Sequence, residues 1–149
     1  MRVLMVCLGN ICRSPMAEGV LRTVAEKRAI SIEVDSAGTA GYHVGEAPDP
    51  RAVRCMKEYG IDISSLRGRQ FSRADFDRFD HILVMDQSNL NNVLALAENE
   101  EHRKKVSLFL EYAPDSALKE VPDPWYGDMR DFHAVYDMLC HAAEGFLVR

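Results

Sequence analysis

The chain has 149 residues, of which 47% are hydrophobic and 28% are charged, a balance ordinary for a globular protein with one folded core. Its net charge of −5 argues against a nucleic-acid partner, because broad phosphate contact requires a basic face. No apolar run approaches the roughly 20 residues of a membrane span, and Gly9, Asn10 and Arg13 follow the short N-terminal run, unlike a signal peptide. We expect one domain over residues 1–149 that binds neither membranes nor nucleic acids.

Strand-like and helix-like segments alternate along the chain. The apolar run within residues 2–7 predicts a strand buried on both faces, and the next helix is expected over about 15–28, with Ser14 as N-cap and Pro15 at its first position. Further strands are expected at 32–36, 81–85 and 106–109, and further helices at 50–59, 73–77, 87–96 and 130–147. This alternation predicts an α/β fold: a four-stranded parallel sheet with helices on both faces, doubly wound in the flavodoxin or Rossmann manner.

The segment 7–15 joins the first strand to the first helix. Gly9 and Asn10 tolerate the backbone angles of a tight loop, and the helix N-terminus behind them favours an anion, typically phosphate. Arg13 adds a planar fork that can hold two oxygens of a tetrahedral oxyanion. The same positive field favours a thiolate at Cys7. Although this Cys–Arg spacing is common by chance, its placement between strand and helix predicts a nucleophile beneath a bound phosphorus.

Two segments resemble one known family. Cys7-Leu8-Gly9-Asn10-Ile11-Cys12-Arg13-Ser14-Pro15 resembles the phosphate-binding loop of the low-molecular-weight protein tyrosine phosphatases, and Asp123-Pro124-Trp125-Tyr126-Gly127 resembles that family's acid loop. The resemblance extends to 35–38, 48–52 and 85–89, in the family's order and across nearly the whole chain. It implies a protein tyrosine phosphatase that hydrolyses phosphotyrosine in protein substrates, and aryl phosphates, through a cysteinyl-phosphate intermediate.

The resemblance also assigns catalytic roles. Sulfur attack by Cys7 divides the reaction into two displacements, and Asp123 protonates the leaving oxygen and later acts as base for water. The loop N–H groups and the guanidinium are expected to hold the phosphate oxygens; they belong to Leu8, Gly9, Asn10, Ile11, Cys12 and Arg13. Taken alone, Asp123-Pro124 is a turn signal, and three nearby carboxyl groups compete with it: Asp115, Glu120 and Asp128. The family match favours Asp123.

Other residues are expected to support the loop or shape its mouth. The resemblance implies that Asn10, Ser14 and Ser36 brace the loop by hydrogen bonds. Trp125 and Tyr126 are expected to line a cleft around an aromatic leaving group. Tyr42 fits that role and an exposed position with no function equally well.

Three further positions bear on the resemblance. Ile11 stands where the related protein-arginine phosphatases carry threonine, which favours the tyrosine type. Leu66 stands where family members often carry a histidine, with Ser64 or Ser65 as candidate substitutes. Asp86 is most simply the N-cap of the following helix, with a role in orienting the loop as the alternative.

The four cysteines and five histidines limit other chemistry. The chain is neither short nor cysteine-dense, which favours a reduced, cytoplasmic protein. Cys12 is either an inert residue on the loop floor or, as the resemblance supports, a reversible disulfide partner of Cys7, whereas Cys55 and Cys140 fit helix cores. No metal or cofactor is expected, since no ligand spacing joins the histidines His43, His81, His102, His133 and His141.

Three other functions compete with tyrosine phosphatase. An arsenate reductase on the same scaffold would need further cysteines to relay a disulfide, and none lies between Cys55 and Cys140. A protein-arginine phosphatase would use the same loop. A non-catalytic phosphate-binding module is disfavoured by the joint presence of Cys7, Arg13 and Asp123.

Overall fold

The computed structural model describes residues 1–148, in which four parallel strands form one sheet in the order β2-β1-β3-β4. The strands are β1 (Arg2–Cys7), β2 (Glu33–Gly38), β3 (His81–Val84) and β4 (Val106–Leu108). Strand β1 pairs with β2 along its whole length and with β3 from Val3 to Val6. The predicted four-stranded parallel sheet is therefore confirmed, with strand ends that differ from expectation by one or two residues.

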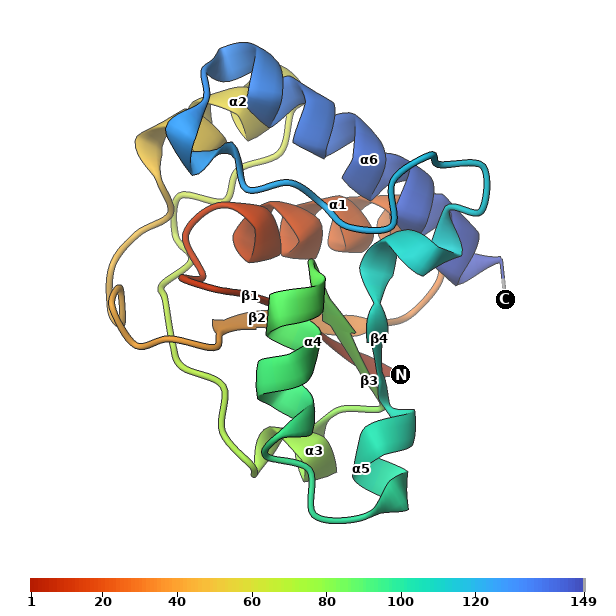
Figure 1. Ribbon diagram of the computed structural model, residues 1–149. Helices are drawn as coiled ribbons and strands as arrows, with labels where there is room; N and C mark the ends of the chain where they lie inside the picture. Colours follow the sequence, from red (N-terminus) through yellow and green to blue (C-terminus); the bar gives the residue numbers. More distant parts are fainter. Residues whose placement is uncertain (149) are drawn as a thin grey trace.

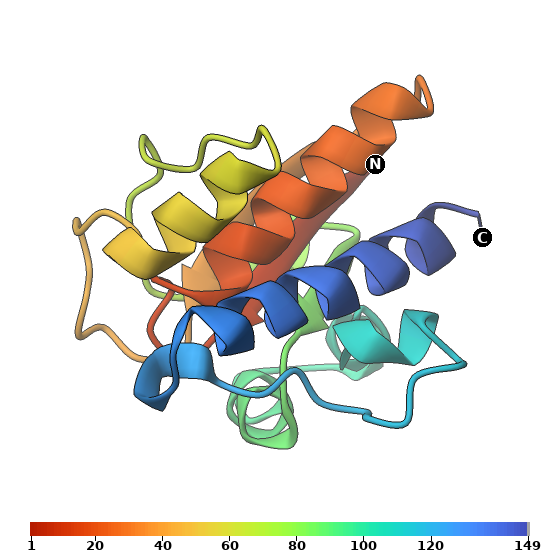
Figure 2. The same cartoon turned by 90° about the horizontal axis from the view of Figure 1, so that it is seen from above.

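Helices cover both faces of the sheet (Figure 1). One face carries α1 (Arg13–Lys27), α2 (Pro50–Glu58) and α6 (Met129–Leu147), and the other carries α3 (Asp75–Arg78), α4 (Gln87–Leu94) and α5 (Glu100–Lys104). Seen from above, α1 and α6 run side by side over their face (Figure 2). Two short 3₁₀ helices interrupt the remaining loops, η1 (Phe109–Tyr112) and η2 (Pro124–Tyr126). No helix within residues 1–148 is long and apolar enough to cross a bilayer.

Strand β1 is the centre of the core. Its residues Val3, Leu4, Met5 and Val6 are all fully buried, which confirms the expectation of a strand covered on both faces. Alternate side chains enter different layers: Val3 and Met5 pack with α1, α2 and α6, and Leu4 and Val6 pack toward α3 and α4.

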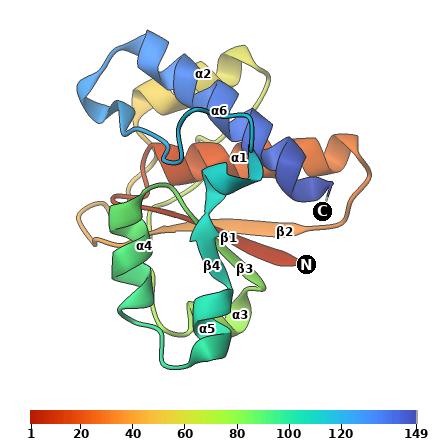
Figure 3. The same cartoon turned by 45° about the vertical axis from the view of Figure 1, so that its right-hand side comes forward.

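The strand order places the site. From β1 the chain crosses to β2 on one side and later to β3 on the other, so the sheet has its topological switch point between β1 and β3. Ligands of open α/β sheets bind outside the carboxyl ends of the strands at this point. Figure 3 shows the turn after β1 and the loop after β2 at the end of the sheet opposite the N-terminus. Cys7 is the last residue of β1 and therefore lies at this end.

Two helix starts tested the capping predictions. Helix α2 begins as expected: the Asp49 carboxylate accepts the Arg51 N–H at 2.7 Å, and Pro50 occupies the first position. Helix α1 begins at Arg13, with Cys12 in the cap position and no side-chain cap, so the prediction of Ser14 as N-cap is wrong. The Ser14 hydroxyl is instead engaged within the loop, where it accepts a hydrogen bond from the Asn10 side chain.

Helix α3 is held by a partly buried ion pair. The Asp75 carboxylate is fully buried and accepts hydrogen bonds from both terminal nitrogens of Arg69 at 3.1 Å and from the Ser72 N–H at 2.9 Å, and the Arg69 side chain is 31% exposed. The helix starts at residue 75 rather than at the expected residue 73, and the Ser72 N–H donates to the Asp75 carboxylate just ahead of that start.

Asp75→Ala should therefore lower the free energy of unfolding by about 2 kcal/mol, since it removes the buried carboxylate that accepts hydrogen bonds from the partly exposed Arg69 side chain and from the Ser72 N–H. Urea denaturation measures the change. Asp77→Ala is the matched control: Asp77 belongs to the same helix and its side chain is 83% exposed, so we expect a change within about 0.5 kcal/mol. Equal destabilisation by the two variants would contradict the assignment.

Candidate active site

The loop after β1 turns sharply at Asn10, which adopts a left-handed backbone conformation with φ of 60°. Asparagine tolerates this region better than most residues. Its side chain is fully engaged: Nδ2 donates to Ser14 Oγ at 2.8 Å and to Ser36 Oγ at 3.0 Å, and Oδ1 accepts the Arg69 N–H at 3.0 Å. The structure thus brings together Asn10, Ser14 and Ser36, which the sequence resemblance had grouped.

The backbone of Arg69, rather than Ser64 or Ser65, contacts the Asn10 side chain. Ser64 donates to Asp62, Ser65 is exposed, and Leu66 packs against the core on the α1 side. The backbone of Arg69 can reach Asn10 because residues 69–71 extend alongside the end of β2: Gly38 N–H donates to the Arg69 carbonyl at 2.9 Å.

A buried carboxyl group lies behind the loop, and sequence reasoning missed it. Ser36 Oγ donates to Glu18 Oε1 at 2.8 Å, and Arg22 donates to Glu18 Oε2 at 2.6 Å. Burial raises the pKa of Glu18, and the bonds from Arg22 and Ser36 only partly offset this. The sequence did carry a signal for this group, because Glu18 is the one charged residue in the stretch 16–21 of α1, which is buried.

The sulfur of Cys7 has two polar neighbours. The Asn10 N–H donates to Sγ at 3.3 Å, and Ser14 Oγ lies 3.0 Å from Sγ. Ser14 Oγ accepts a hydrogen bond from the Asn10 side chain, and its single hydrogen has two acceptors within reach, the sulfur and the Ala37 carbonyl at 3.4 Å. Cys7 itself is 3% exposed.

Two hydrogen bonds of one terminal nitrogen fix the guanidinium of Arg13. Its Nη1 donates to Asp86 Oδ2 at 2.6 Å and to the Val121 carbonyl at 3.1 Å, so Nε and Nη2 are the nitrogens left for a ligand. Asp86 also caps α4 by accepting the Asn89 N–H. The expected N-cap role of Asp86 is therefore confirmed, and its contact with Arg13 joins the N-termini of helices on opposite faces of the sheet.

A cavity of about 260 Å³ opens over the loop. Its lining includes the three predicted catalytic residues, Cys7, Arg13 and Asp123, and the predicted aromatic rim of Tyr42, Trp125 and Tyr126. It also includes four of the residues predicted to bind phosphate: Leu8, Gly9, Ile11 and Cys12. Asp123 Oδ2 lies 3.7 Å from Arg13 Nη2, and its Oδ1 accepts the Trp125 N–H at 3.0 Å. A carboxyl group, a thiol and a guanidinium thus share one cavity.

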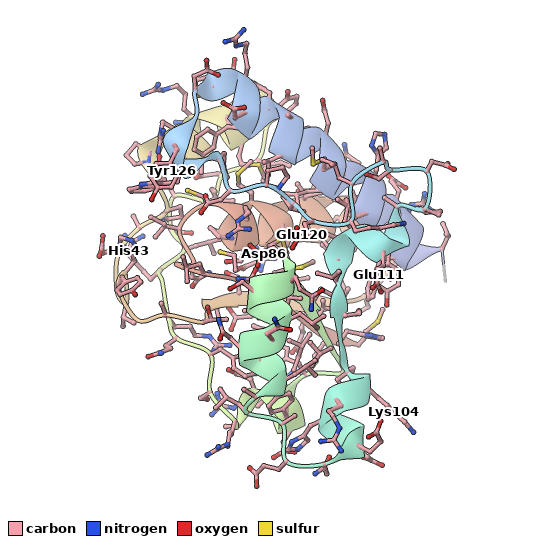
Figure 4. The ribbon with its side chains drawn as sticks, viewed as in Figure 1. His43, Asp86, Lys104, Glu111, Glu120 and Tyr126 are labelled. Atoms are coloured by element: carbon pink, nitrogen blue, oxygen red, sulfur yellow. The ribbon has the colours of Figure 1, made fainter. Side chains whose placement is uncertain are left out.

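The three competing carboxyl groups lie elsewhere. Glu120 accepts the Gln87 N–H at 2.6 Å, and Figure 4 shows it beside Asp86 near the start of α4. Asp128 caps α6 by accepting the Arg130 N–H at 2.9 Å. Asp115 lines a different cavity, between η1 and α6. Of the four candidates, Asp123 is the one that lines the cavity over Cys7.

The mouth of the cavity is aromatic. Tyr126 is 92% exposed, Tyr42 76% and Trp125 41%, and all three line the cavity. His43, which was not predicted as a site residue, lies between them, with ring centroids 6.5 Å from Tyr42 and 6.2 Å from Trp125. Figure 4 shows His43 and Tyr126 at the same edge of the molecule. A side chain at Gly9 would lie 3.1 Å from His43, so the glycine permits this close approach.

All four cysteines are free. Burial, followed by the charge of Asp49, raises the pKa of the Cys12 thiol well above its ordinary value. Cys55, fully buried on α2, has a pKa raised by burial to about 11, and burial also raises the pKa of Cys140 on α6. Cys12 shares the cavity with Cys7, and Cys55 and Cys140 are outside its lining. Within residues 1–148, no group of three or more His, Cys, Asp or Glu side chains is arranged to hold a metal ion.

A doubly wound sheet that presents a thiol and a guanidinium in one anion-sized loop defines the scaffold of a cysteine-dependent phosphatase. The model of the family described as "Low molecular weight phosphotyrosine protein phosphatase" matches residues 2–149. The chain belongs to this family, and its enzyme class is protein tyrosine phosphatase.

Individual relatives agree. The protein of that name from Schizosaccharomyces pombe is 44% identical over 149 residues, covering 98% of this chain and 94% of the relative. A human protein of the same name is 43% identical, covering 97% of this chain and 92% of the relative. The crystal structure of an Entamoeba histolytica protein tyrosine phosphatase with Hepes in its active site matches with a TM-score of 0.95 and 37% identity, covering 99% and 95% of the two chains. A drosophila arginine phosphatase matches with a TM-score of 0.93 and 35% identity, covering 99% and 96%.

Proposed function

We propose that this phosphatase acts on phosphotyrosine in proteins, and on small aryl phosphates, by two displacements at Cys7. The sulfur attacks phosphorus, the bond to the phenol oxygen breaks, and Asp123 gives that oxygen its proton. Water then attacks the cysteinyl-phosphate, Asp123 takes the proton from water, and phosphate leaves with the thiolate restored. The observation that supports this scheme is the convergence of Cys7, Arg13 and Asp123 on one cavity.

The loop supplies the charge stabilisation in this proposal. The phosphoryl-transfer transition state is loose, so its three equatorial oxygens need donors already in place. The N–H groups from Leu8 to Arg13 and the two free nitrogens of the Arg13 fork are the candidate donors. Asp86 and the Val121 carbonyl hold that fork in one orientation before a substrate arrives.

Substrate choice is proposed to follow from the aromatic mouth. Tyr42, Trp125 and Tyr126 stand around the entrance while the sulfur lies 3% exposed at its base. A phosphorylated phenol is long enough to reach the sulfur and presents a ring to these side chains. Phosphoserine is shorter and has no ring, so we expect poor turnover.

Peptides that carry phosphotyrosine, phosphoserine or phosphoarginine test the proposal, each with the wild type and Cys7→Ser. We expect rapid phosphate release from phosphotyrosine by the wild type and none by the variant. Faster release from phosphoserine would overturn the assignment of the mouth. Release by the variant at the wild-type rate would overturn the assignment of the nucleophile.

A protein-arginine phosphatase is the second candidate, since one of the similar solved structures is described as an arginine phosphatase. Ile11, nearly buried in the cavity lining, is the position at which the sequence favours the tyrosine type. The phosphoarginine peptide decides between the two. The arsenate reductase alternative loses support, because Cys55 and Cys140 have raised pKa values and lie outside the cavity lining.

Asp123→Ala should reduce kcat on phosphotyrosine by about 10²- to 10³-fold, since the leaving phenol then departs without a proton donor. Anion binding should persist, so the inhibition constant for phosphate is expected to change little. Steady-state kinetics with phosphate as inhibitor measures both quantities. Asp115→Ala, in the same long loop but at the other cavity, should match the wild type, and an unchanged rate for Asp123→Ala would move the acid elsewhere.

We also propose that Cys12 resolves oxidation of Cys7. Peroxide converts the Cys7 thiolate to a sulfenic acid, and the Cys12 thiolate then forms the disulfide while hydroxide leaves and becomes water. Because the pKa of Cys12 is raised, its thiolate fraction should grow about tenfold per pH unit through neutrality. The rate of disulfide formation in excess peroxide should therefore rise with pH. Mass spectrometry of acid-quenched samples measures this rate. A pH-independent rate would contradict the role, and Cys140→Ser is the control expected to leave it unchanged.

The proposed working compartment is the cytoplasm. Four free cysteines, one of them a candidate nucleophile, suit a reducing environment better than an oxidising one. Protein substrates with phosphotyrosine are the proposed partners.

A further inference from the structure

Arg51, in the first turn of α2, contacts the loop that carries Asp123. Its Nη2 donates to the Trp125 carbonyl at 3.0 Å, and its Nη1 donates to the Gly127 carbonyl at 3.3 Å. The guanidinium carbon also lies 5.5 Å from the centre of the Trp125 ring and 4.8 Å from that of Phe132 on α6. One side chain therefore contacts both the backbone and the aromatic side chain of η2.

The other side of Arg51 is tied to the phosphate loop through Asp49. Arg51 Nε and Nη2 donate to the two carboxylate oxygens of Asp49 at 3.1 and 3.0 Å. The Asp49 N–H donates to the Ile11 carbonyl at 2.8 Å. Burial alone would raise the pKa of Asp49, but the hydrogen bonds and charge of Arg51 hold it below its ordinary value. A continuous chain of contacts thus runs from the phosphate loop through α2 to η2.

Few other hydrogen bonds hold the backbone of the loop near Asp123. Before it, the Val121 N–H donates to the Met85 carbonyl and the Val121 carbonyl accepts Arg13. After it, the next anchored point is the Asp128 cap of α6. Within the described residues, Arg51 is the only side chain from outside the segment 122–127 that hydrogen-bonds the backbone of that segment.

We propose that Arg51 is a positioning residue for proton transfer, which holds η2 so that the Asp123 carboxyl group stays over the leaving oxygen. The inference rests on the role proposed above for Asp123. Arg51 is absent from the cavity lining, so it acts on the reaction without lining the site where the reacting groups meet. A displacement of about 1 Å in a reacting group can cost about 10²-fold in rate.

The test compares Arg51→Gln with Arg54→Gln, one turn further along α2, where the arginine is exposed. We measure kcat/KM on p-nitrophenyl phosphate, whose leaving group needs little protonation, and on phenyl phosphate, whose leaving group needs much. Arg51→Gln should lose about 30-fold on phenyl phosphate and about threefold on p-nitrophenyl phosphate, with the phosphate inhibition constant unchanged. Arg54→Gln should match the wild type on both substrates.

The double variant shows whether Arg51 acts through Asp123. In the Asp123→Ala background, Arg51→Gln should lower kcat/KM on phenyl phosphate by less than about twofold, because the group that Arg51 positions is already gone. Arg51→Lys, which keeps the charge and stem but not the fork, should give an intermediate loss if the carbonyl contacts matter.

Three outcomes would overturn the inference. They are equal losses of kcat/KM on both substrates in Arg51→Gln, a raised inhibition constant for phosphate, or single-variant losses that multiply in the double variant. Failure of the underlying function has a different signature. If the loss of kcat/KM in Asp123→Ala is no larger on phenyl phosphate than on p-nitrophenyl phosphate, the assignment of Asp123 as the acid fails, and the positioning role fails with it. If Asp123→Ala loses more kcat/KM on phenyl phosphate than on p-nitrophenyl phosphate and Arg51→Gln loses equally on both, only the positioning role fails.

Discussion

Cys7→Ser is expected to reduce kcat on aryl phosphates by at least about 10⁴-fold while phosphate still binds. A serine hydroxyl must lose its proton to become a nucleophile, and the neighbours of position 7, the Ser14 hydroxyl and the Asn10 amide, do not supply a base. The donors of the phosphate loop and Arg13 are unaffected by the substitution, so the anion site persists. Initial rates with p-nitrophenyl phosphate and calorimetric titration with phosphate measure the two effects separately.

The control for this variant is Cys140→Ser, a half-buried cysteine of α6 outside the cavity lining. It should retain wild-type turnover. Loss of phosphate binding together with turnover in Cys7→Ser would mean that the loop had collapsed, and Ser14→Ala would then separate loop geometry from nucleophile chemistry, since it keeps the sulfur and removes one contact to it. Undiminished turnover by Cys7→Ser would refute the proposed mechanism.

Arg13→Lys is the second large effect, with an expected fall in kcat/KM of about 10³-fold. A lysine ammonium is a point charge that cannot hold two phosphate oxygens and at the same time donate to Asp86 and the Val121 carbonyl. Unlike Cys7→Ser, this variant should also weaken phosphate inhibition, because the fork contacts the anion in the ground state too.

Steady-state kinetics with phosphate inhibition tests this prediction, and the free energy of unfolding should be measured alongside, since Arg13 is buried. Arg22→Lys is the matched control: Arg22 lies on the same helix and contacts the buried Glu18, away from the cavity. It should leave phosphate inhibition unchanged. A kcat/KM within a few-fold of wild type for Arg13→Lys would show that charge alone suffices and that the paired geometry is dispensable.

The N-terminal unit was predictable because its signals are local. The buried strand β1, the break at Gly9 and Asn10, and the helix that follows lie within 27 consecutive residues, and their hydrophobic pattern and turn residues act over short range. The capping prediction for Ser14 was wrong for a tertiary reason. Its hydroxyl has partners in Asn10 and Cys7 of the loop and in the Ala37 carbonyl of β2, and this pairing depends on how the loop closes against β2 rather than on helix propensity.

The second half of the site was not predictable from local pattern. Asp123, Glu120 and Asp128 are all carboxyl groups in one long loop, and the family resemblance was the only sequence argument that separated them. In the structure Asp128 caps α6, Glu120 accepts the N–H of the first residue of α4, and only Asp123 among these three lines the cavity. The contact of Glu120 could not be foreseen, because its partner Gln87 lies 33 positions away.

Local patterns in the sequence were enough to define an alternating α/β chain with a thiol and a guanidinium in one short loop, because strand burial, turn residues and helix starts act over a few neighbouring residues. The surroundings of that loop came from the folded arrangement: Asp86 contacts Arg13 from across the sheet, Glu18 lies behind Ser36, and Arg51 contacts the loop of Asp123. These contacts join residues far apart in the chain. They exist because a parallel sheet gathers the carboxyl ends of its strands at one edge and packs helices from both faces around it.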